Sequence, residues 1–229
     1  MSSVFVRQTL TLLLKDLRRE VRTKEILTTT VSFAVLLMVV FTFAFYQDDE
    51  SVKIVFPGIL WVSILFSGVL AIGRTFAQEK DGGCLRAIAL IPGTDLSLYY
   101  AKLIINLLFL LTFEAILLPI LALAFNVAIV AQLPLYAVAL VVPTLGFVAI
   151  GTLIAAMLVH SHLREVLLPV LLFPLAVPLI IVGVKITAAL FEGADFATIW
   201  PWLKLAVAMD FVYVFIAQFL FRWVLSAIE

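Results

Sequence analysis

Long apolar runs alternate with short polar stretches along almost the whole chain, and this pattern predicts a membrane protein. A helix needs about 20 apolar residues to cross roughly 30 Å of hydrocarbon. Six runs reach that length, so we expect spans at about 26–46, 54–73, 103–125, 133–159, 166–186 and 204–225. The predicted fold class is therefore all-α, with residues 1–229 forming one polytopic membrane domain.

The composition supports the same class. Hydrophobic residues make up 65% of the 229 residues and charged residues 13%, whereas a soluble domain is nearer half apolar and a quarter charged. A net charge of zero does not favour nucleic acid as a partner. The single cysteine, Cys84, excludes an internal disulfide and fits no metal-ligand spacing. The first apolar run begins only at Ile26 and lacks an A-x-A ending, so we expect it to remain as a signal anchor.

Residues 5–26 have the pattern of an amphipathic helix. Apolar residues recur at i, i+3, i+4 and i+7, and cations fall on the opposite face. A helix of this kind lies in the membrane interface, although an ordinary solvated first helix is the alternative. The apolar face comprises Val6, Leu10, Leu13, Leu14, Leu17 and Val21, and the cationic face Arg7, Lys15, Arg18, Arg19 and Arg22.

The distribution of Lys and Arg predicts the orientation. With the N-terminus placed in the cytoplasm, twelve of the fifteen cations fall on the cytoplasmic side and three, Lys53, Lys185 and Lys204, on the other. Cytoplasmic loops carry the excess of Lys and Arg. Both termini and the segment 74–102 are therefore predicted to be cytoplasmic.

The segment 74–102 is the longest polar interruption in the chain. Glu79 to Gly83 is predicted to break the second span, Cys84 to Ile91 to form a short helix with one apolar face, and Pro92-Gly93 to end it. Twenty-nine residues exceed the length of an ordinary connector. We expect a coupling helix that docks on a separate soluble subunit; the alternative is a solvated loop lying on the membrane.

The sequence offers little chemistry of its own. It contains no Walker A loop, no H-E-x-x-H and no plausible Ser-His-Asp or Cys-His set, so we expect neither a catalytic residue nor a metal site. His160 and His162 are predicted to be interfacial polar residues. The fifth span is predicted to be kinked by Pro169, Pro174 and Pro178.

Two carboxyl groups fall inside predicted spans, Glu114 and Asp210. A carboxylate in hydrocarbon costs several kcal/mol unless it meets a partner or a cavity. Two interpretations remain open: a proton or substrate path, or a hydrogen bond between helices.

Three stretches resemble one known family. The loop EKDGGCLRAIALIP (79–92) is similar to that of ABC-2-type permeases. More narrowly, residues 55–94, PTLGF (143–147) and LLPVLLFPLAVPLIIVGV (167–184) resemble CcmB, the family of haem exporter permeases that act in cytochrome c maturation. This resemblance implies a non-catalytic permease in the bacterial inner membrane. It places the contact with the ATPase on Glu79, Gly82, Gly83, Leu85, Arg86 and Ile88.

The same resemblance implies the partners. They are a CcmA-type ATP-binding subunit that holds ATP and Mg²⁺, CcmC- and CcmD-type membrane subunits, the haem chaperone CcmE, and a second copy of the chain. Haem is handled by the complex, and the resemblance supplies no haem ligand here. Three alternatives stay open: an ABC-2-type exporter of a lipid or hydrophobic drug, an ATP-independent proton-coupled carrier using Glu114 and Asp210, and a passive scaffold.

Overall fold

A computed structural model describes residues 2–44, 49–81, 94–127 and 129–226. All the regular secondary structure in these ranges is helical, which agrees with the all-α prediction. The helices are α1 (Ser2–Thr23), α2 (Glu25–Ala44), α3 (Asp49–Asp81), α5 (Asp95–Ala124), the 3-10 turn η1 (Val130–Gln132), α6 (Leu133–Met157), α7 (Arg164–Phe191) and α8 (Phe196–Ser226).

Five of these helices are long and apolar enough to cross a bilayer: α3 over Val55–Ala77, then α5, α6, α7 and α8. The chain is thus an integral membrane protein. The segments Val4–Thr23 and Thr28–Phe41, in α1 and α2, pass the same test only together, as a pair bent by 61°. The number of six spans stays a prediction, because the sixth depends on how this bent pair meets the membrane.

Helices α3 and α5 extend beyond the predicted second and third spans. Helix α3 continues to Asp81, so Glu79 lies in its last turn and does not begin a break. Helix α5 begins at Asp95 and not at Leu103. The charged residues here are acceptable helix formers; hydropathy marks where a helix leaves hydrocarbon, and not where the helix ends. The stretch between the two helices is 82–94, much shorter than the predicted 74–102.

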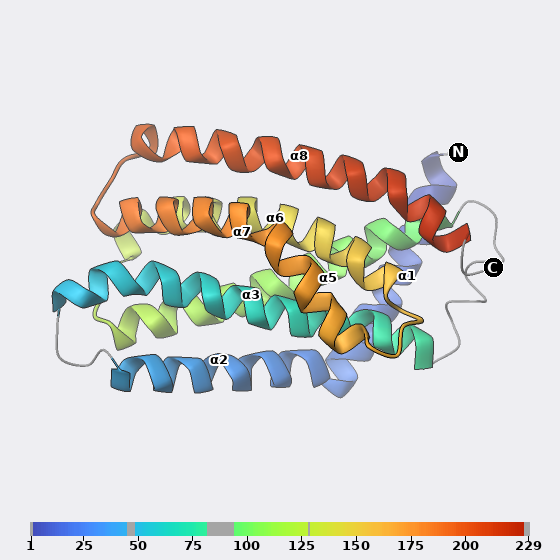
Figure 1. Cartoon of the computed structure of the whole chain (residues 1–229), viewed down its shortest axis with the longest axis horizontal. Helices are drawn as coiled ribbons and strands as arrows, with labels where there is room; N and C mark the ends of the chain where they lie inside the picture. Colours follow the sequence, from blue (N-terminus) through green and yellow to red (C-terminus); the bar gives the residue numbers. More distant parts are fainter. Residues whose placement is uncertain (1, 45–48, 82–93, 128, 227–229) are drawn as a thin grey trace.

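Helix α6 is the centre of an elongated bundle (Figure 1). It contacts α8 and α7 most extensively, and also α5 and α3. Of the spanning window of α6, 72% is buried inside the bundle, against 22% of the window of α8 at the edge. Helix α2 lies on the opposite edge, beside α3 and α5. Because α6 is apolar nearly all round, it suits a position surrounded by other helices.

One end of the bundle gathers the elements that the sequence assigns to the cytoplasm. The end of α3, the start of α5, the first residues of α1 and the end of α8 all lie there in Figure 1. Helix α1 runs across this end and packs on α5. The start of α3, the end of α7 and the start of α8, which carry the three remaining cations, lie at the other end.

Helix α7 stays continuous through Pro169, Pro174 and Pro178, but Figure 1 shows it bent. Each proline removes one backbone donor, and the freed carbonyl groups need other partners. In this stretch the Tyr213 hydroxyl of α8 donates a hydrogen bond to the Leu175 carbonyl oxygen at 2.7 Å. This bond ties the proline-rich part of α7 to α8, beside the carbonyl group of residue 174 that Pro178 frees.

Helix α8 begins with a side-chain cap. Asp195 Oδ1 accepts hydrogen bonds from the Thr198 backbone N–H at 3.0 Å and from the Thr198 hydroxyl at 2.7 Å. These bonds favour the carboxylate and hold the pKa of Asp195 below its ordinary value. An aspartate at this position satisfies one of the free N–H groups of the first turn.

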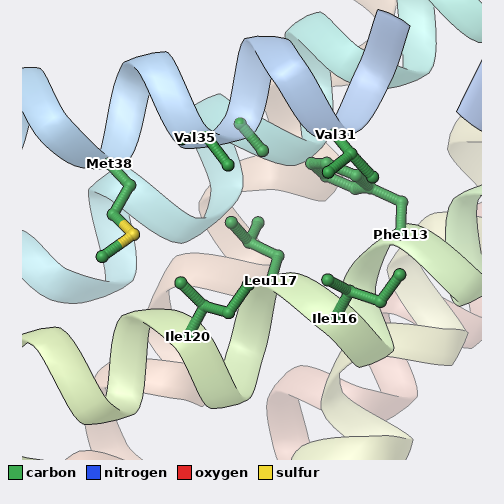
Figure 2. Close-up of a pocket in the computed structure, with 8 residues that line it drawn as sticks. Val31, Val35, Met38, Phe113, Ile116, Leu117 and Ile120 are labelled. Atoms are coloured by element: carbon green, nitrogen blue, oxygen red, sulfur yellow. The ribbon is translucent and has the colours of Figure 1, made fainter. Parts of the chain in front are cut away.

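A small gap separates α2 from α5 (Figure 2). Its volume is about 10 Å³, roughly the space of one water molecule, and an apolar cavity of that kind stays dry. We therefore assign it no ligand. Its lining is entirely apolar: Val31, Ala34, Val35, Met38, Phe113, Ile116, Leu117 and Ile120.

Close packing of α7 on α3 depends on a glycine. A Cβ atom at Gly183 would overlap the ring of Trp61, which is 2% exposed. By contrast, a Cβ atom at Gly58 would meet nothing within 4 Å.

We expect Gly183→Ala to lower the free energy of unfolding by about 1–3 kcal/mol, the usual cost of overpacking a tight core. Gly58→Ala is the matched control, since it adds the same methyl group in open space. Thermal unfolding of both variants in detergent measures the difference. Equal unfolding temperatures would show that α3 and α7 do not pack as described.

Candidate functional site

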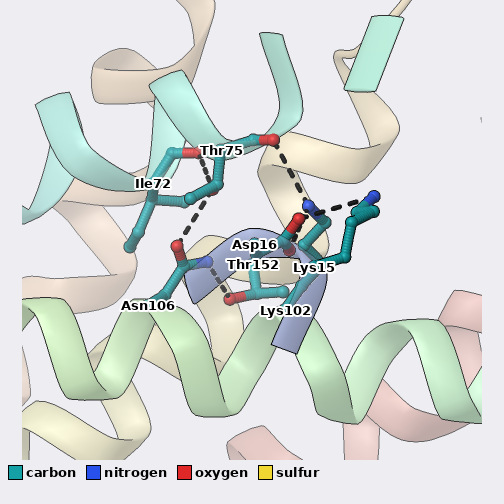
Figure 3. Close-up of polar contacts among 7 residues, drawn as sticks. All are labelled: Lys15, Asp16, Ile72, Thr75, Lys102, Asn106 and Thr152. Carbon is teal, nitrogen blue, oxygen red and sulfur yellow. Dashed lines mark hydrogen bonds and ion pairs between the residues drawn. The ribbon is translucent and has the colours of Figure 1, made fainter. Parts of the chain in front are cut away.

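The helices on either side of the predicted coupling segment meet in a buried group of polar residues. We call this group the polar junction and define it as Asp16, Thr75, Lys102, Asn106 and Thr152 (Figure 3). Its members come from α1, α3, α5 and α6. Such a cluster in an apolar bundle must satisfy its own hydrogen bonds, because neither lipid nor water can do so.

Lys102 is the charged centre of the polar junction. Its side chain is 2% exposed, and its Nζ atom lies 2.7 Å from Asp16 Oδ2. The same ammonium group lies 3.5 Å from the Thr75 carbonyl oxygen and 5.9 Å from the centroid of the Phe76 ring. A buried cation is tolerated only when such partners replace its hydration. Lys102 thus ties α5 to α1 and to the last turns of α3.

Hydrogen bonds extend the polar junction toward α6. The Thr75 hydroxyl lies 2.9 Å from Asn106 Oδ1 and 2.8 Å from the Ile72 carbonyl oxygen, and its single proton serves one acceptor at a time. Asn106 Nδ2 donates to Thr152 Oγ1 at 3.1 Å. The ends of α3 and α5 are therefore fixed to the central helix as well as to α1.

Further contacts hold the first two helices in place. The Ser97 hydroxyl donates to Gln8 Oε1 at 3.1 Å, which joins the first turn of α5 to α1. Arg74 of α3 forms an ion pair with Glu25 of α2. That pair is 45% and 42% exposed, so it contributes little to stability. The buried contacts carry most of the attachment.

Helix α1 has three faces, where the sequence indicated two. Thr9, Asp16 and Glu20 lie toward the bundle; Thr9 and Glu20 are each 7% exposed. The four arginines are exposed and Lys15 is half-buried; the predicted apolar face is exposed too, apart from the half-buried Leu13. The exposed apolar side chains are Val6, Leu10, Leu14, Leu17 and Val21.

Comparison with known proteins identifies the family at this point. The family model described as "CcmB protein" matches residues 7–226, which is nearly the whole chain. The chain belongs to the CcmB family. The match includes every helix of the polar junction.

Three relatives carry the name "Heme exporter protein B". That of Bradyrhizobium diazoefficiens is 29% identical over 71% of this chain and 73% of the relative. That of Pseudomonas aeruginosa is 24% identical over 86% and 88%. That of Rhodobacter capsulatus is 27% identical over 80% and 83%. The likeness extends along most of each protein, so the family assignment applies to the chain as a whole.

The predicted coupling residues of this CcmB-family chain fall at the edge of the described ranges. Glu79 is in the last turn of α3, and its side chain is not described. Gly82, Gly83, Leu85, Arg86 and Ile88 lie outside the described residues, as does Cys84. Their role stays a prediction; the structure describes α3 and α5, the helices on either side of them.

The two intramembrane carboxyl groups lie on different sides of α6 at the same level. The Thr144 hydroxyl donates to Glu114 Oε1 at 2.6 Å, and a Cβ atom at Gly146 would overlap Asp210 Oδ1. Both acids are buried, at 1% and 6% exposure. Glu114 thus makes the interhelical hydrogen bond that the sequence left open. Glu114 Oε2 and Asp210 Oδ1 have no hydrogen-bond partner among the described residues.

The two histidines, predicted to be interfacial polar residues, lie between helices. His160 and His162 are in the connection between α6 and α7, and both are exposed. Across the parts of the chain that the structure describes, no three His, Cys, Asp or Glu side chains gather into a metal-binding group.

Sequence reasoning misses the polar junction. Lys102 counts there only as a loop cation, and nothing marks Asp16, Thr75 or Thr152. Asn106 alone gives a usable signal, since an amide inside an apolar run needs a partner.

We expect Lys102→Met to destabilise the protein by about 3–5 kcal/mol, because it removes the buried cation of the pair and leaves the Asp16 carboxylate only the partly exposed Lys15. The variant should also release α1, so limited trypsin digestion at Arg18 and Arg19 should become faster. Thermal unfolding and the digestion rate are the two measurements.

Lys15→Met provides the control for this prediction. Lys15 also approaches Asp16, at 3.4 Å, but its side chain is 39% exposed. Removing it should cost less than about 1 kcal/mol. If the two variants behave alike, the polar junction does not hold α1.

Proposed function

We propose that this chain is the membrane permease subunit of an ABC transporter for c-type cytochrome maturation. The family match over residues 7–226 is the observation that carries the proposal, and the relatives named "Heme exporter protein B" support the link to haem. The chain itself is non-catalytic in this proposal. A separate CcmA-type subunit binds ATP and Mg²⁺, and the complex handles haem.

The proposed partners follow the family. They are CcmC- and CcmD-type membrane subunits, the CcmE-type haem chaperone, whose haem-loaded form is released at the periplasmic side, and a second copy of this chain. We place the complex in the bacterial inner membrane with both termini in the cytoplasm. The gathering of both terminal helices and of the flanks of segment 82–94 at one end of the bundle is compatible with this orientation.

The polar junction supports a coupling role for the segment between α3 and α5. A force applied to this segment enters the last turns of α3 and the first turns of α5. These turns are joined through Lys102 and Thr75, and Asp16 adds α1 to the same unit. The three helices therefore move together, and Asn106 transmits the displacement to α6.

Helix α1 provides the second support. Its exposed apolar face and its cationic face suit a position in the membrane interface. Anchored there, α1 gives the moving ends of α3 and α5 a fixed reference at the membrane surface.

We expect Arg86→Glu to weaken the association with the ATPase subunit by about tenfold or more, since a reversed charge in a docked surface costs several kcal/mol. ATPase activity of the copurified complex in nanodiscs should lose its stimulation by the permease. Arg22→Glu, on the exposed side of α1, is the control. Unchanged stimulation with Arg86→Glu would remove the docking assignment.

A second function, an ATP-independent proton-coupled carrier, is favoured by the unpartnered oxygens of Glu114 and Asp210. We propose it as the lesser candidate, because Glu114 already has a hydrogen bond that explains its burial.

Cytochrome c maturation, measured by haem staining, separates the two functions. Glu114→Gln should leave maturation within about twofold of wild type, because glutamine keeps an oxygen that accepts the Thr144 hydrogen bond. An ATPase-dead partner should abolish maturation. The opposite pair of results would favour the carrier.

A further inference from the structure

A cavity of about 450 Å³ lies at the end of the bundle that carries α1 and the flanks of segment 82–94. Its apolar part is formed by Val69 and Leu70 of α3, Leu158 after α6, and Leu168 of α7. Its charged part is one turn closer to the end of α3, at Arg74. Phe76 and Ala77, further along α3 than Arg74, line it as well, so the cavity brings apolar and charged side chains together.

Among the described residues, the lining of the charged part carries one excess positive charge. Three arginines, Arg19, Arg74 and Arg164, line the cavity together with two carboxylates, Glu25 and Glu165. Arg74 is already paired with Glu25. An anion with a single net negative charge would complete the balance.

Among these arginines, Arg164 can donate a further hydrogen bond. Its Nη1 atom is buried and has no hydrogen-bond partner in the described part of the chain. Arg164 also opens α7, a helix of 28 residues whose first turn has no side-chain cap. The N–H groups and the dipole of a helix start favour an anion at this place. Glu165 lines the same cavity and repels an anion, so Arg164 must supply most of the attraction.

The cavity is continuous with a stripe of α3 that faces outward between α2 and α7. Phe66, Leu70 and Arg74 follow one another at four-residue spacing on this stripe, and Phe66 and Leu70 are 41% and 39% exposed. Phe66 does not line the cavity, so its exposure is toward the bilayer. Its ring contacts Phe33 of α2 at 6.0 Å and Phe173 of α7 at 5.5 Å, which closes the apolar end. Leu70 lines the cavity and is also 39% exposed, so the cavity has an apolar opening beside Leu70 where an acyl chain can lie.

We propose that this cavity binds one anionic phospholipid, with its phosphate at Arg164 and an acyl chain along Leu70 between α2 and α7. The cavity, its charge balance and the exposed stripe of α3 support this binding independently of the transport role proposed above. A soluble phosphate would bind the same arginines, but it has no apolar group to contact Val69, Leu70 and Leu168. The apolar half of the cavity therefore favours a lipid.

The test uses the full-length chain in detergent, incubated with phosphatidylglycerol or phosphatidylcholine and examined by native mass spectrometry. Wild type should retain one phosphatidylglycerol in preference to phosphatidylcholine. Arg164→Gln should lower the retained phosphatidylglycerol by roughly tenfold, because it removes a charge-assisted contact. Arg22→Gln, an exposed arginine outside the cavity, should retain it as wild type does. Equal retention in the two variants would overturn the proposal.

A second pair of variants tests the acyl-chain part without changing any charge. Leu70→Trp fills the cavity and should also lower retention. Leu220→Trp is the matched control, because Leu220 is 40% exposed on α8 and does not line the cavity. Since both leucines are exposed, neither change should prevent folding, which circular dichroism checks. Equal retention here would exclude the acyl-chain site.

Competition separates a lipid from a free phosphate. Inorganic phosphate or glycerol 3-phosphate, at the same concentration as the lipid, should not displace phosphatidylglycerol from wild type. Displacement by either would assign the cavity to a soluble phosphate and overturn the lipid proposal.

Discussion

The ammonium group of Lys102 has to be neutralised inside an apolar bundle, and this requirement arranges one end of the molecule. A lysine that is 2% exposed cannot reach the headgroups. Asp16 supplies the opposite charge and Thr75 a carbonyl oxygen. Helix α1 must therefore lie against α5, and the end of α3 must lie beside both. Breaking such a pair costs far more than an exposed pair contributes, so this arrangement of three helices behaves as one unit.

The remainder of the bundle is held together by close packing of apolar side chains. Helix α6 packs among α3, α5, α7 and α8 with an almost wholly apolar surface. In lipid, close packing of small residues replaces the hydrophobic force that drives a soluble core together. Gly183 against Trp61 and Gly146 against Asp210 show this close approach. Helix α7 is bent in Figure 1, and Tyr213 ties its proline-rich part to α8.

The two ends of the molecule differ in the features they carry. The polar junction and the 450 Å³ cavity both lie at the end that receives the coupling segment in the proposed function. Arg74 lies one residue before Thr75 and lines the cavity, so the two features share the last turns of α3. A bound lipid and a docked ATPase would therefore act on the same helix. At the other end the connections are short, and Asp195 caps α8.

The sequence by itself determined the fold class, the membrane location and the family, because hydropathy and the blocks at 55–94, 143–147 and 167–184 are local properties of the chain. Helices α6 and α7 lie at the stretches 133–159 and 166–186 where it predicted spans, while α8 begins at Phe196, before the predicted 204. The sequence could not locate the ends of α3 and α5, because hydropathy indicates which residues lie in the hydrocarbon and not where a helix ends. Only the tertiary structure decided the partner of Lys102, which is 86 residues away in the sequence. The bundle-facing side of α1 was hidden for the same reason: what a helix buries depends on its neighbour, and no periodicity within α1 records that neighbour.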